Sequence, residues 1–194
     1  MISLLFILAS YCIGAIPTGY WLGKAWKNID IRQYGSGNVG ATNVFRVLGK
    51  GPGLVTLFID ITKGLIPVLF ARHFFPSTSE IALAVGIAAI IGHTLSFFIR
   101  FRGGKGVATS AGVFAGLAPL PFLLALSVFA ATFGITRWVS LSSLSAAMGL
   151  GIGTFLFPTA LPIRITAWLV TIFIFWTHRA NMQRLRLGTE PKLL

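Results

Sequence analysis

Acidic residues are scarce in this chain of 194 residues. Only four are Asp or Glu, and charged residues of both signs make up 10% of the sequence. Soluble domains carry roughly 25% charged residues, and four carboxylates cannot solvate the surface of a 20.9 kDa globule. Hydrophobic residues make up 55% of the chain, and its mean hydropathy is +0.84. The composition excludes most soluble folds and predicts an integral membrane protein.

Cysteine is nearly absent as well. Cys12 is the only one and lies in an apolar stretch, so no internal disulfide is possible. No cluster of His, Cys, Asp and Glu has the spacing of metal ligands, and no pattern requires an organic cofactor, so we expect neither a metal nor a cofactor. A carboxylate pair for glycosidic chemistry and a G-x-S-x-G elbow are both missing. Little conventional acid–base machinery is available.

Positive charge, by contrast, is abundant. Sixteen Lys and Arg residues give a net charge of +12 and a pI of about 11.2. Such a balance is typical of proteins that bind nucleic acid or an anionic membrane surface. The cations fall in short clusters between apolar runs, which argues against nucleic acid. We therefore expect anionic lipid headgroups or phosphorylated small molecules as partners.

Apolar runs of about 20 residues predict membrane-spanning helices. The clear candidates are, approximately, Ile2–Leu22, Leu54–Ala71, Ile81–Ile99, Trp138–Phe157 and Ile165–Trp176. The stretch Val107–Ile135 is either one long span or two short ones broken at Pro119-Leu120-Pro121. Because a Pro-x-Pro pair is unfavourable inside one helix, we favour two.

The distribution of Lys and Arg orients these spans. With seven helices, the N-terminus outside and the C-terminus inside, 13 of the 16 cations lie on the cytoplasmic side. Arg72 and Arg164 then lie outside, and Lys63 lies within a span. Six spans would leave the basic C-terminal tail outside, against the positive-inside rule. We expect an all-α integral membrane protein with seven transmembrane helices, forming a single polytopic domain over residues 1–194, with its glycine-rich polar segments on the cytoplasmic side.

The first of these segments covers residues 35–46. It matches the G-x-G-x-x-G pattern and has Walker A glycine spacing, but no strand precedes it, so both matches are interpreted as accidental. Glycines still let backbone amides approach an anion, and a helix starting near Thr42 would direct its N–H groups at it. The candidate anion ligands are Ser36, Gly37, Asn38, Gly40, Thr42, Asn43 and Arg46. If residues 43–50 are helical, Asn43, Arg46 and Lys50 share one face. The alternative is a flexible connector.

Asp60 and Lys63 lie in the next apolar segment, three residues apart, and therefore face the same way. Ionisable residues within a membrane are costly and usually pair or line a polar cavity. An ion pair that locks helices together and a direct role in a site both remain open.

The third segment covers residues 92–107. The i, i+3, i+7 spacing of His93, Ser96 and Arg100 predicts that they fall on one helical face. Lys105 follows among Gly103, Gly104 and Gly106, a cationic element with exposed backbone of the kind that holds phosphate. His93 could instead be a hydrogen-bonded packing residue.

The last polar segment is the tail that begins at His178. His178 and Asn181 lie on one face if the final helix continues inward. A basic amphipathic tail can also be simply a lipid anchor.

Together these segments resemble the bacterial acyl-phosphate:glycerol-3-phosphate acyltransferases, the PlsY family. The resemblance rests on several motifs in the family's order: GAIPT at residues 14–18, SGNVGATNVFR, DITKG, GHTLSFFIRFRGGKGVAT and HRANMQRLRLGTEPK. It covers nearly the whole chain.

The resemblance implies an enzyme of phospholipid synthesis in the bacterial inner membrane, with its active site facing the cytoplasm. It would transfer a fatty acyl group from acyl phosphate to the 1-hydroxyl of glycerol 3-phosphate, giving lysophosphatidic acid and inorganic phosphate. A soluble enzyme that makes acyl phosphate would act upstream. No thioester donor would be used, which agrees with the absence of a histidine followed five residues later by an aspartate.

Our mechanistic hypothesis divides the site by substrate. The first segment would hold one phosphate, Lys105 would neutralise the other or the charge developing on the carbonyl, and His178 and Asn181 would orient glycerol 3-phosphate. The expected catalytic residues are thus Ser36, Arg46, Lys105, His178 and Asn181. Residues that could support the site from behind are Asp60, Lys63, His93 and Ser96. His178, His93 and a phosphate oxygen of the donor are all candidate proton acceptors, and we favour the donor phosphate.

A transporter of phosphorylated organic anions is the alternative function. Basic groups within a helical bundle would suit it. Transporters, however, tend to place their site at mid-membrane between inverted repeats, whereas these polar motifs gather on one side.

Overall fold

The computed structural model describes residues 2–193, and within that range every regular element is a helix. The described chain divides into two compact units, residues 1–116 and residues 117–194, which are considered separately. The expectation of a single domain over residues 1–194 stays a prediction.

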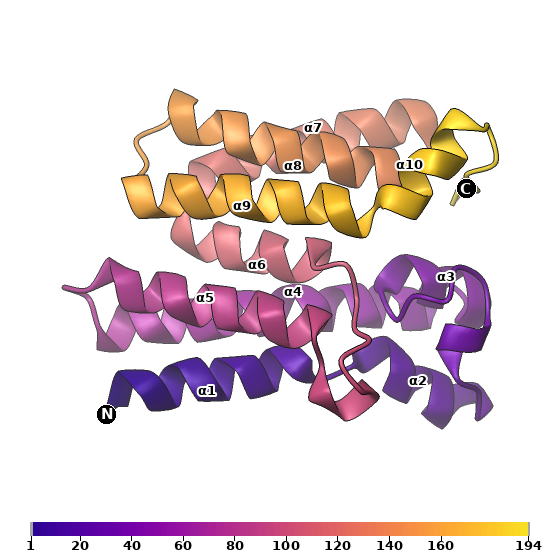
Figure 1. Cartoon of the computed structure of the whole chain (residues 1–194), viewed down its shortest axis with the longest axis horizontal. Coiled ribbons are helices and arrows are strands. Elements are labelled where there is room, and N and C mark those ends of the chain that lie inside the picture. The colour runs from indigo at the N-terminus through magenta and orange to yellow at the C-terminus, as the bar shows by residue number, and fades with distance from the viewer. Residues whose placement is uncertain (1, 194) are drawn as a thin grey trace. The chain divides into compact units, whose positions relative to one another are not determined.

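The first unit carries eight helical elements, shown in Figure 1 from indigo to pink. They are α1 (Ile2–Ala15), α2 (Thr18–Lys27), η1 (Ile31–Gln33), α3 (Ala41–Leu48), α4 (Lys50–Phe74), α5 (Ser79–Thr94), η2 (Phe97–Ile99) and α6 (Val107–Leu117). Helices α1, α4 and α5 pack against one another. Helices α1 and α5 approach closely at Gly14, where a Cβ would strike the backbone of Ala89, and α4 and α6 approach at Gly64, where a Cβ would strike the backbone of Thr109. Such close approach through small residues is typical of helix packing in membranes.

The second unit is built from α7 (Pro119–Thr136), α8 (Val139–Leu156), α9 (Leu161–Thr177) and α10 (Arg179–Arg186). Helix α8 packs on both α7 and α9. Helices α9 and α10 meet at His178 with a bend of 59°.

The protein has an all-helical integral membrane fold. Five of the described helices are long and apolar enough to cross a membrane, or six if the bent pair α9–α10 forms one span. Large apolar side chains on their surfaces are exposed, as lipid contact requires; Ile135 and Leu169 are examples. Helix α6 is apolar but only 11 residues long.

The predicted break within Val107–Ile135 is confirmed, since α6 ends at Leu117 and α7 begins at Pro119. The proline pair does not lie between helices, however. Pro119 and Pro121 both fall in the first turn of α7. The backbone N–H groups of a first turn have no partner within the helix, so proline loses nothing there.

Two predicted helical faces are wrong. Helix α5 ends at Thr94, so His93, Ser96 and Arg100 do not share a face. Helix α3 ends at Leu48, and a left-handed Gly49 (φ 101°) separates it from α4, which contains Lys50. Asn43 and Arg46 therefore lie on a different helix from Lys50.

Candidate active site

Two glycine-containing loops of the first unit carry many of the predicted site residues. The first glycine loop, residues 34–40, connects η1 to α3, and the second, residues 100–106, connects η2 to α6. The predicted helix near Thr42 is confirmed, because α3 begins at Ala41 directly after the first loop.

Asn43 closes the first glycine loop from inside. Its side chain is almost completely buried. The Oδ1 atom accepts a hydrogen bond from the Ser36 N–H at 2.8 Å. The Nδ2 atom lies within hydrogen-bond distance of the carbonyl oxygens of Tyr34 (3.0 Å), Asn38 (2.8 Å) and Ile31 (3.3 Å). The sequence predicts Asn43 as a phosphate ligand. In the structure its amide bonds to the surrounding chain and orients the backbone of the loop.

The backbone of this loop requires glycine at two places. Gly35 and Gly37 have φ angles of 59° and 72°, in the left-handed region that L-residues with side chains rarely adopt. A Cβ on Gly35 would also collide with the Asn43 amide. Asn38 Oδ1 accepts the Gly40 N–H at 2.8 Å, which fixes the residue preceding α3. Ser36 is exposed, and the side chains of Asn38 and Asn43 fix the shape of the loop that carries it.

The start of α3 presents Thr42 and Arg46 one helical turn apart, which places them on the same side. Both side chains are half-buried. The positive charge of Arg46 lies near the N-terminal end of α3, where the first backbone N–H groups of a helix have no partner within it. Both features favour the binding of an anion.

The second glycine loop folds back on the end of α5. The N–H groups of Gly103 and Gly104 donate to the carbonyl oxygens of Thr94 and His93, each at 3.0 Å. Arg100 and Phe101 make the turn with left-handed φ angles of 57° and 59°. The half-buried Lys105 comes next, and Gly106, with φ 86°, leads into α6.

A cleft of about 850 Å³ lies between the two loops. Gly37 of the first loop and Gly103 of the second both line it. The other lining residues are Tyr20, Asp30, Arg32, Gln33, Phe98, Ile99, Arg100 and Arg102. The structure therefore brings one glycine of each predicted segment to a single cationic space within the first unit, whereas Ser36, Arg46 and Lys105 are not among its lining residues.

Arg32 links the two sides of this cleft. Its guanidinium pairs with Asp30 at 2.7 Å, lies over the Tyr20 ring at 4.9 Å and donates to the Ile99 carbonyl at 3.5 Å. The hydrogen bond from Arg32, with its positive charge, holds the pKa of Asp30 below its usual value. Since Asp30 neutralises Arg32, the excess positive charge of the cleft comes from Arg100 and Arg102.

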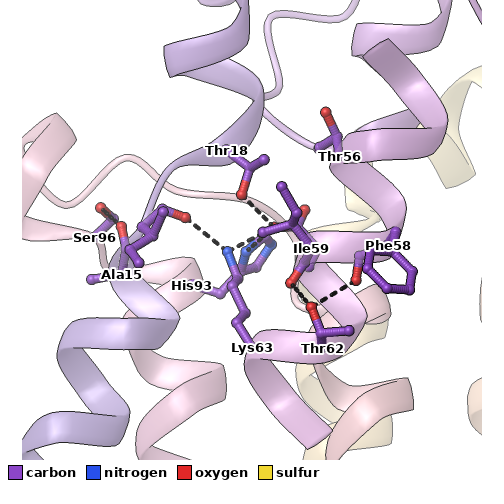
Figure 2. A network of polar contacts seen from close by, with 12 residues as sticks. Ala15, Thr18, Thr56, Phe58, Ile59, Thr62, Lys63, His93 and Ser96 are labelled. Atoms are coloured by element: carbon purple, nitrogen blue, oxygen red, sulfur yellow. Dashed lines mark hydrogen bonds and ion pairs between the residues drawn. The ribbon is translucent and has the colours of Figure 1, made fainter. Parts of the chain in front are cut away.

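A buried polar cluster lies behind the second loop (Figure 2). Lys63 Nζ contacts Asp60 Oδ1 at 2.7 Å and donates to the Ile16 carbonyl at 2.9 Å. His93 Nδ1 is 3.7 Å from the same Asp60 oxygen. The Thr18 hydroxyl donates to that oxygen at 3.4 Å. The predicted common orientation of Asp60 and Lys63 is confirmed. Ser96 lies nearby and donates to the Ala15 carbonyl.

In the second unit, His178 and Asn181 are both buried at the bend between α9 and α10. His178 Nδ1 is 2.8 Å from the Ile174 carbonyl. A carbonyl only accepts, so this contact favours the tautomer with its proton on Nδ1 and a basic Nε2. Asn181 Nδ2 donates to Glu190 Oε1 at 2.6 Å.

Glu190 is a residue that the sequence analysis missed. Its carboxylate also accepts from Arg184 Nε at 2.7 Å, and its carbonyl accepts from Trp138 Nε1 at 3.1 Å. It thereby orients the Asn181 amide and ties the tail to the start of α8. The one available signal was a lone acid in a basic tail, because a net charge of +12 makes an acid there unusual.

Comparison with known proteins identifies the family. The family model described as "Glycerol-3-phosphate acyltransferase" matches residues 4–188. Proteins of that name from Listeria welshimeri and Geotalea daltonii are 47% and 45% identical to this chain, with alignments covering 98% and 97% of it and 96% of each relative. The chain belongs to the glycerol-3-phosphate acyltransferase family.

Solved structures agree with this membership. The fold is similar to the crystal structure of PlsY (YgiH), described as an integral membrane glycerol 3-phosphate acyltransferase, in its glycerol 3-phosphate form. The TM-score is 0.94 at 36% identity, covering 99% of this chain and 96% of that one. The lysophosphatidic acid form of PlsY matches with a TM-score of 0.90 at 35% identity, covering 99% and 95%. The predicted family is therefore confirmed.

Proposed function

We propose that this protein transfers a fatty acyl group from acyl phosphate to the 1-hydroxyl of glycerol 3-phosphate, releasing lysophosphatidic acid and inorganic phosphate. Family membership makes it a glycerol-3-phosphate acyltransferase of phospholipid synthesis. The structural observation that carries the proposal is the cationic cleft lined by both glycine loops. Two phosphate-bearing substrates repel each other, and such a site lowers that repulsion.

We assign the first phosphate to the first glycine loop and the start of α3. Ser36 supplies a hydroxyl donor, and Thr42 and Arg46 supply a further donor and a charge. Gly37 and Gly40 shape the loop, because their N–H groups donate to the Tyr34 carbonyl and to Asn38 Oδ1. Asn38 and Asn43 hold that shape, as their hydrogen bonds within the loop indicate. This division of labour supports anion binding by groups that are oriented before the ligand arrives.

Lys105 is assigned to the second phosphate and to the charge that develops on the carbonyl oxygen. Gly103, Gly104 and Gly106 shape the loop that presents it, since the N–H groups of Gly103 and Gly104 already donate to the Thr94 and His93 carbonyls. Transition-state charge is best stabilised by donors that are already in place. From the tail motif we retain His178 and Asn181 as the residues that orient glycerol 3-phosphate. Glu190 supports this by orienting the Asn181 amide.

The chemistry requires little from the protein beyond positioning and charge. The 1-hydroxyl oxygen attacks the acyl carbonyl, its proton passes to a phosphate oxygen of the donor, and the bond from the carbonyl carbon to the phosphate oxygen breaks. The donor's phosphate is our preferred acceptor of that proton. His178 is the alternative, and the basic Nε2 of its favoured tautomer suits that role.

We further propose seven membrane crossings, with the N-terminus outside and the site facing the cytoplasm of a bacterial cell, in its inner membrane. Helix α6 would rise only about 16 Å along its axis, half of a typical hydrocarbon core. If it completes one crossing, the second glycine loop lies below the membrane surface. Gly104 and Gly106 are buried, and non-helical backbone at such depth is tolerated only inside protein. A soluble enzyme that makes acyl phosphate would supply the donor.

The test uses purified protein in lipidic mesophase with palmitoyl phosphate and glycerol 3-phosphate. Phosphate release should require both substrates. Lys105→Ala and Arg46→Ala should each lower it at least about 100-fold, as loss of a transition-state charge contact does, while circular dichroism stays unchanged. Uptake of glycerol 3-phosphate into vesicles without acyl transfer would instead indicate a transporter.

A further inference from the structure

The buried cluster of Asp60, Lys63 and His93 is costly for a protein in lipid. All three side chains are at most 6% exposed. Burying an ion pair among apolar helices gains little stability, and well-packed apolar residues would often serve as well or better. A pure packing role therefore leaves the presence of the cluster unexplained, and its neighbours indicate what else it does.

The cluster contacts the second glycine loop through His93. The His93 carbonyl accepts the Gly104 N–H, and the Thr94 carbonyl accepts the Gly103 N–H. A Cβ placed on Gly104 would collide with three atoms of the His93 imidazole ring. One side of the ring faces Asp60. The other side packs against the second glycine loop at Gly104, one residue before Lys105.

The cluster also contacts the element that positions the first glycine loop. Thr18, in the first turn of α2, donates to Asp60, and Lys63 holds the Ile16 carbonyl at the break between α1 and α2. Next along α2, Gly19 lies so close to Val39 that a Cβ there would strike the Val39 carbonyl oxygen. The start of α2 therefore contacts both the cluster and the last part of the first loop, so a shift of the cluster would also shift that part of the loop.

We propose that the Asp60–Lys63–His93 cluster sets the spacing between the two glycine loops, with His93 acting as the positioning residue for Lys105. This rests on the proposed function, in which each loop serves one phosphate. The two loops lie far apart in the sequence, and the cluster contacts the second directly and the first through α2. A misplacement of about 1 Å in a catalytic group can cost about 100-fold in rate.

A double-mutant cycle between His93 and Gly104 tests this coupling. Gly104→Ala should lower kcat about 100-fold, because its methyl group meets the buried His93 ring. His93→Ala should lower kcat about tenfold and change the KM of either substrate less than twofold, because Lys105 acts mainly on transition-state charge. The double variant should match His93→Ala within about threefold, because removing the ring removes the collision.

Gly103→Ala is the matched control. A Cβ there would meet the carbonyl oxygens of His93 and Thr94, which every residue retains. It should therefore cost the same factor in the parent protein and in the His93→Ala variant. If Gly104→Ala costs the same factor in both backgrounds, or if His93→Ala keeps the parent kcat, the proposal is wrong. His93→Gln, which also lacks the ring, replaces His93→Ala in the cycle if that variant does not fold.

Hydrogen exchange separates this proposal from the proposed function, since it needs no turnover. His93→Ala should speed exchange of the Gly103 and Gly104 amides at least about tenfold, while the centre of α4 stays protected. A simple structural lock would instead lower the unfolding temperature and leave the kinetic constants of the folded fraction unchanged. Failure of the parent protein to release phosphate would contradict the proposed function, with the exchange result still testing the cluster.

Discussion

At the scale of single residues, Asn43 shows how one side chain can organise a binding loop. One amide accepts from the Ser36 N–H and faces three carbonyl oxygens of the surrounding chain. Only a group that both donates and accepts, and that is uncharged, satisfies all of these atoms. Residue type and spacing predict Asn43 to be an anion ligand, because they do not reveal whether an amide points outward or inward.

Asn43→Asp should therefore be disruptive although it is nearly isosteric. The carboxylate keeps the acceptor for Ser36 but points negative charge at carbonyl oxygens, each of which loses its donor. We expect a loss of about 1–3 kcal/mol in unfolding free energy and at least about tenfold in kcat/KM. Thermal unfolding and steady-state phosphate release measure the two effects. Asn28→Asp, the same change on an exposed residue, is the control; equal effects at both positions would contradict this role.

At the scale of elements, the order of the helices could be predicted from hydropathy, but their ends could not. The predicted span does reach Ile99, but its α-helix ends at Thr94, because the chain beyond turns back and pairs with the carbonyls of His93 and Thr94. That pairing depends on the path of the loop and leaves no periodic signal. In the same way, Glu190 reaches Asn181 only because the chain reverses after α10.

The tail that follows α10 should be sensitive to acid. Burial raises the pKa of Glu190, but the hydrogen bonds from Asn181 and Arg184, with the positive charge of Arg184, help to outweigh it and lower the pKa below its usual value of 4.5. A lowered carboxylate pKa stabilises the fold above the unfolded-state pKa, and this stabilisation is lost as pH falls below 4.5 through the folded-state value.

Hydrogen exchange in α10 between pH 7 and pH 3 measures this loss. Protection of Arg179–Arg186 should fall at the acid end in the parent protein, and Glu190→Gln should already show reduced protection at pH 7 with less further change. Glu80→Gln, at the exposed start of α5, should behave like the parent. An identical acid response in Glu190→Gln would show that another group is responsible.

At the scale of the whole molecule, the proposed orientation follows from charge. The seven-crossing arrangement places 13 of 16 cations in the cytoplasm, and each crossing has a helix to serve it if α6 counts as one. Composition was sufficient to predict a membrane protein, and the glycine motifs were sufficient to predict the family. The roles of buried side chains within the loops required coordinates.

Cysteine labelling tests this orientation. In a background with Cys12 replaced by serine, Ser77→Cys in the α4–α5 connection should react with an impermeant maleimide on intact cells. Thr189→Cys in the tail should react only after permeabilisation. Both positions are exposed. Labelling of Thr189→Cys on intact cells would rule out the proposed arrangement.

The contact between the His93 ring and Gly104 also constrains how this gene can change over generations. Because a Cβ at residue 104 would collide with the imidazole, an alanine there should be harmful while His93 is present and better tolerated once residue 93 is smaller. Residues 93 and 104 should therefore covary among related sequences. A lineage that departs from glycine at 104 should be one in which histidine at 93 was lost first.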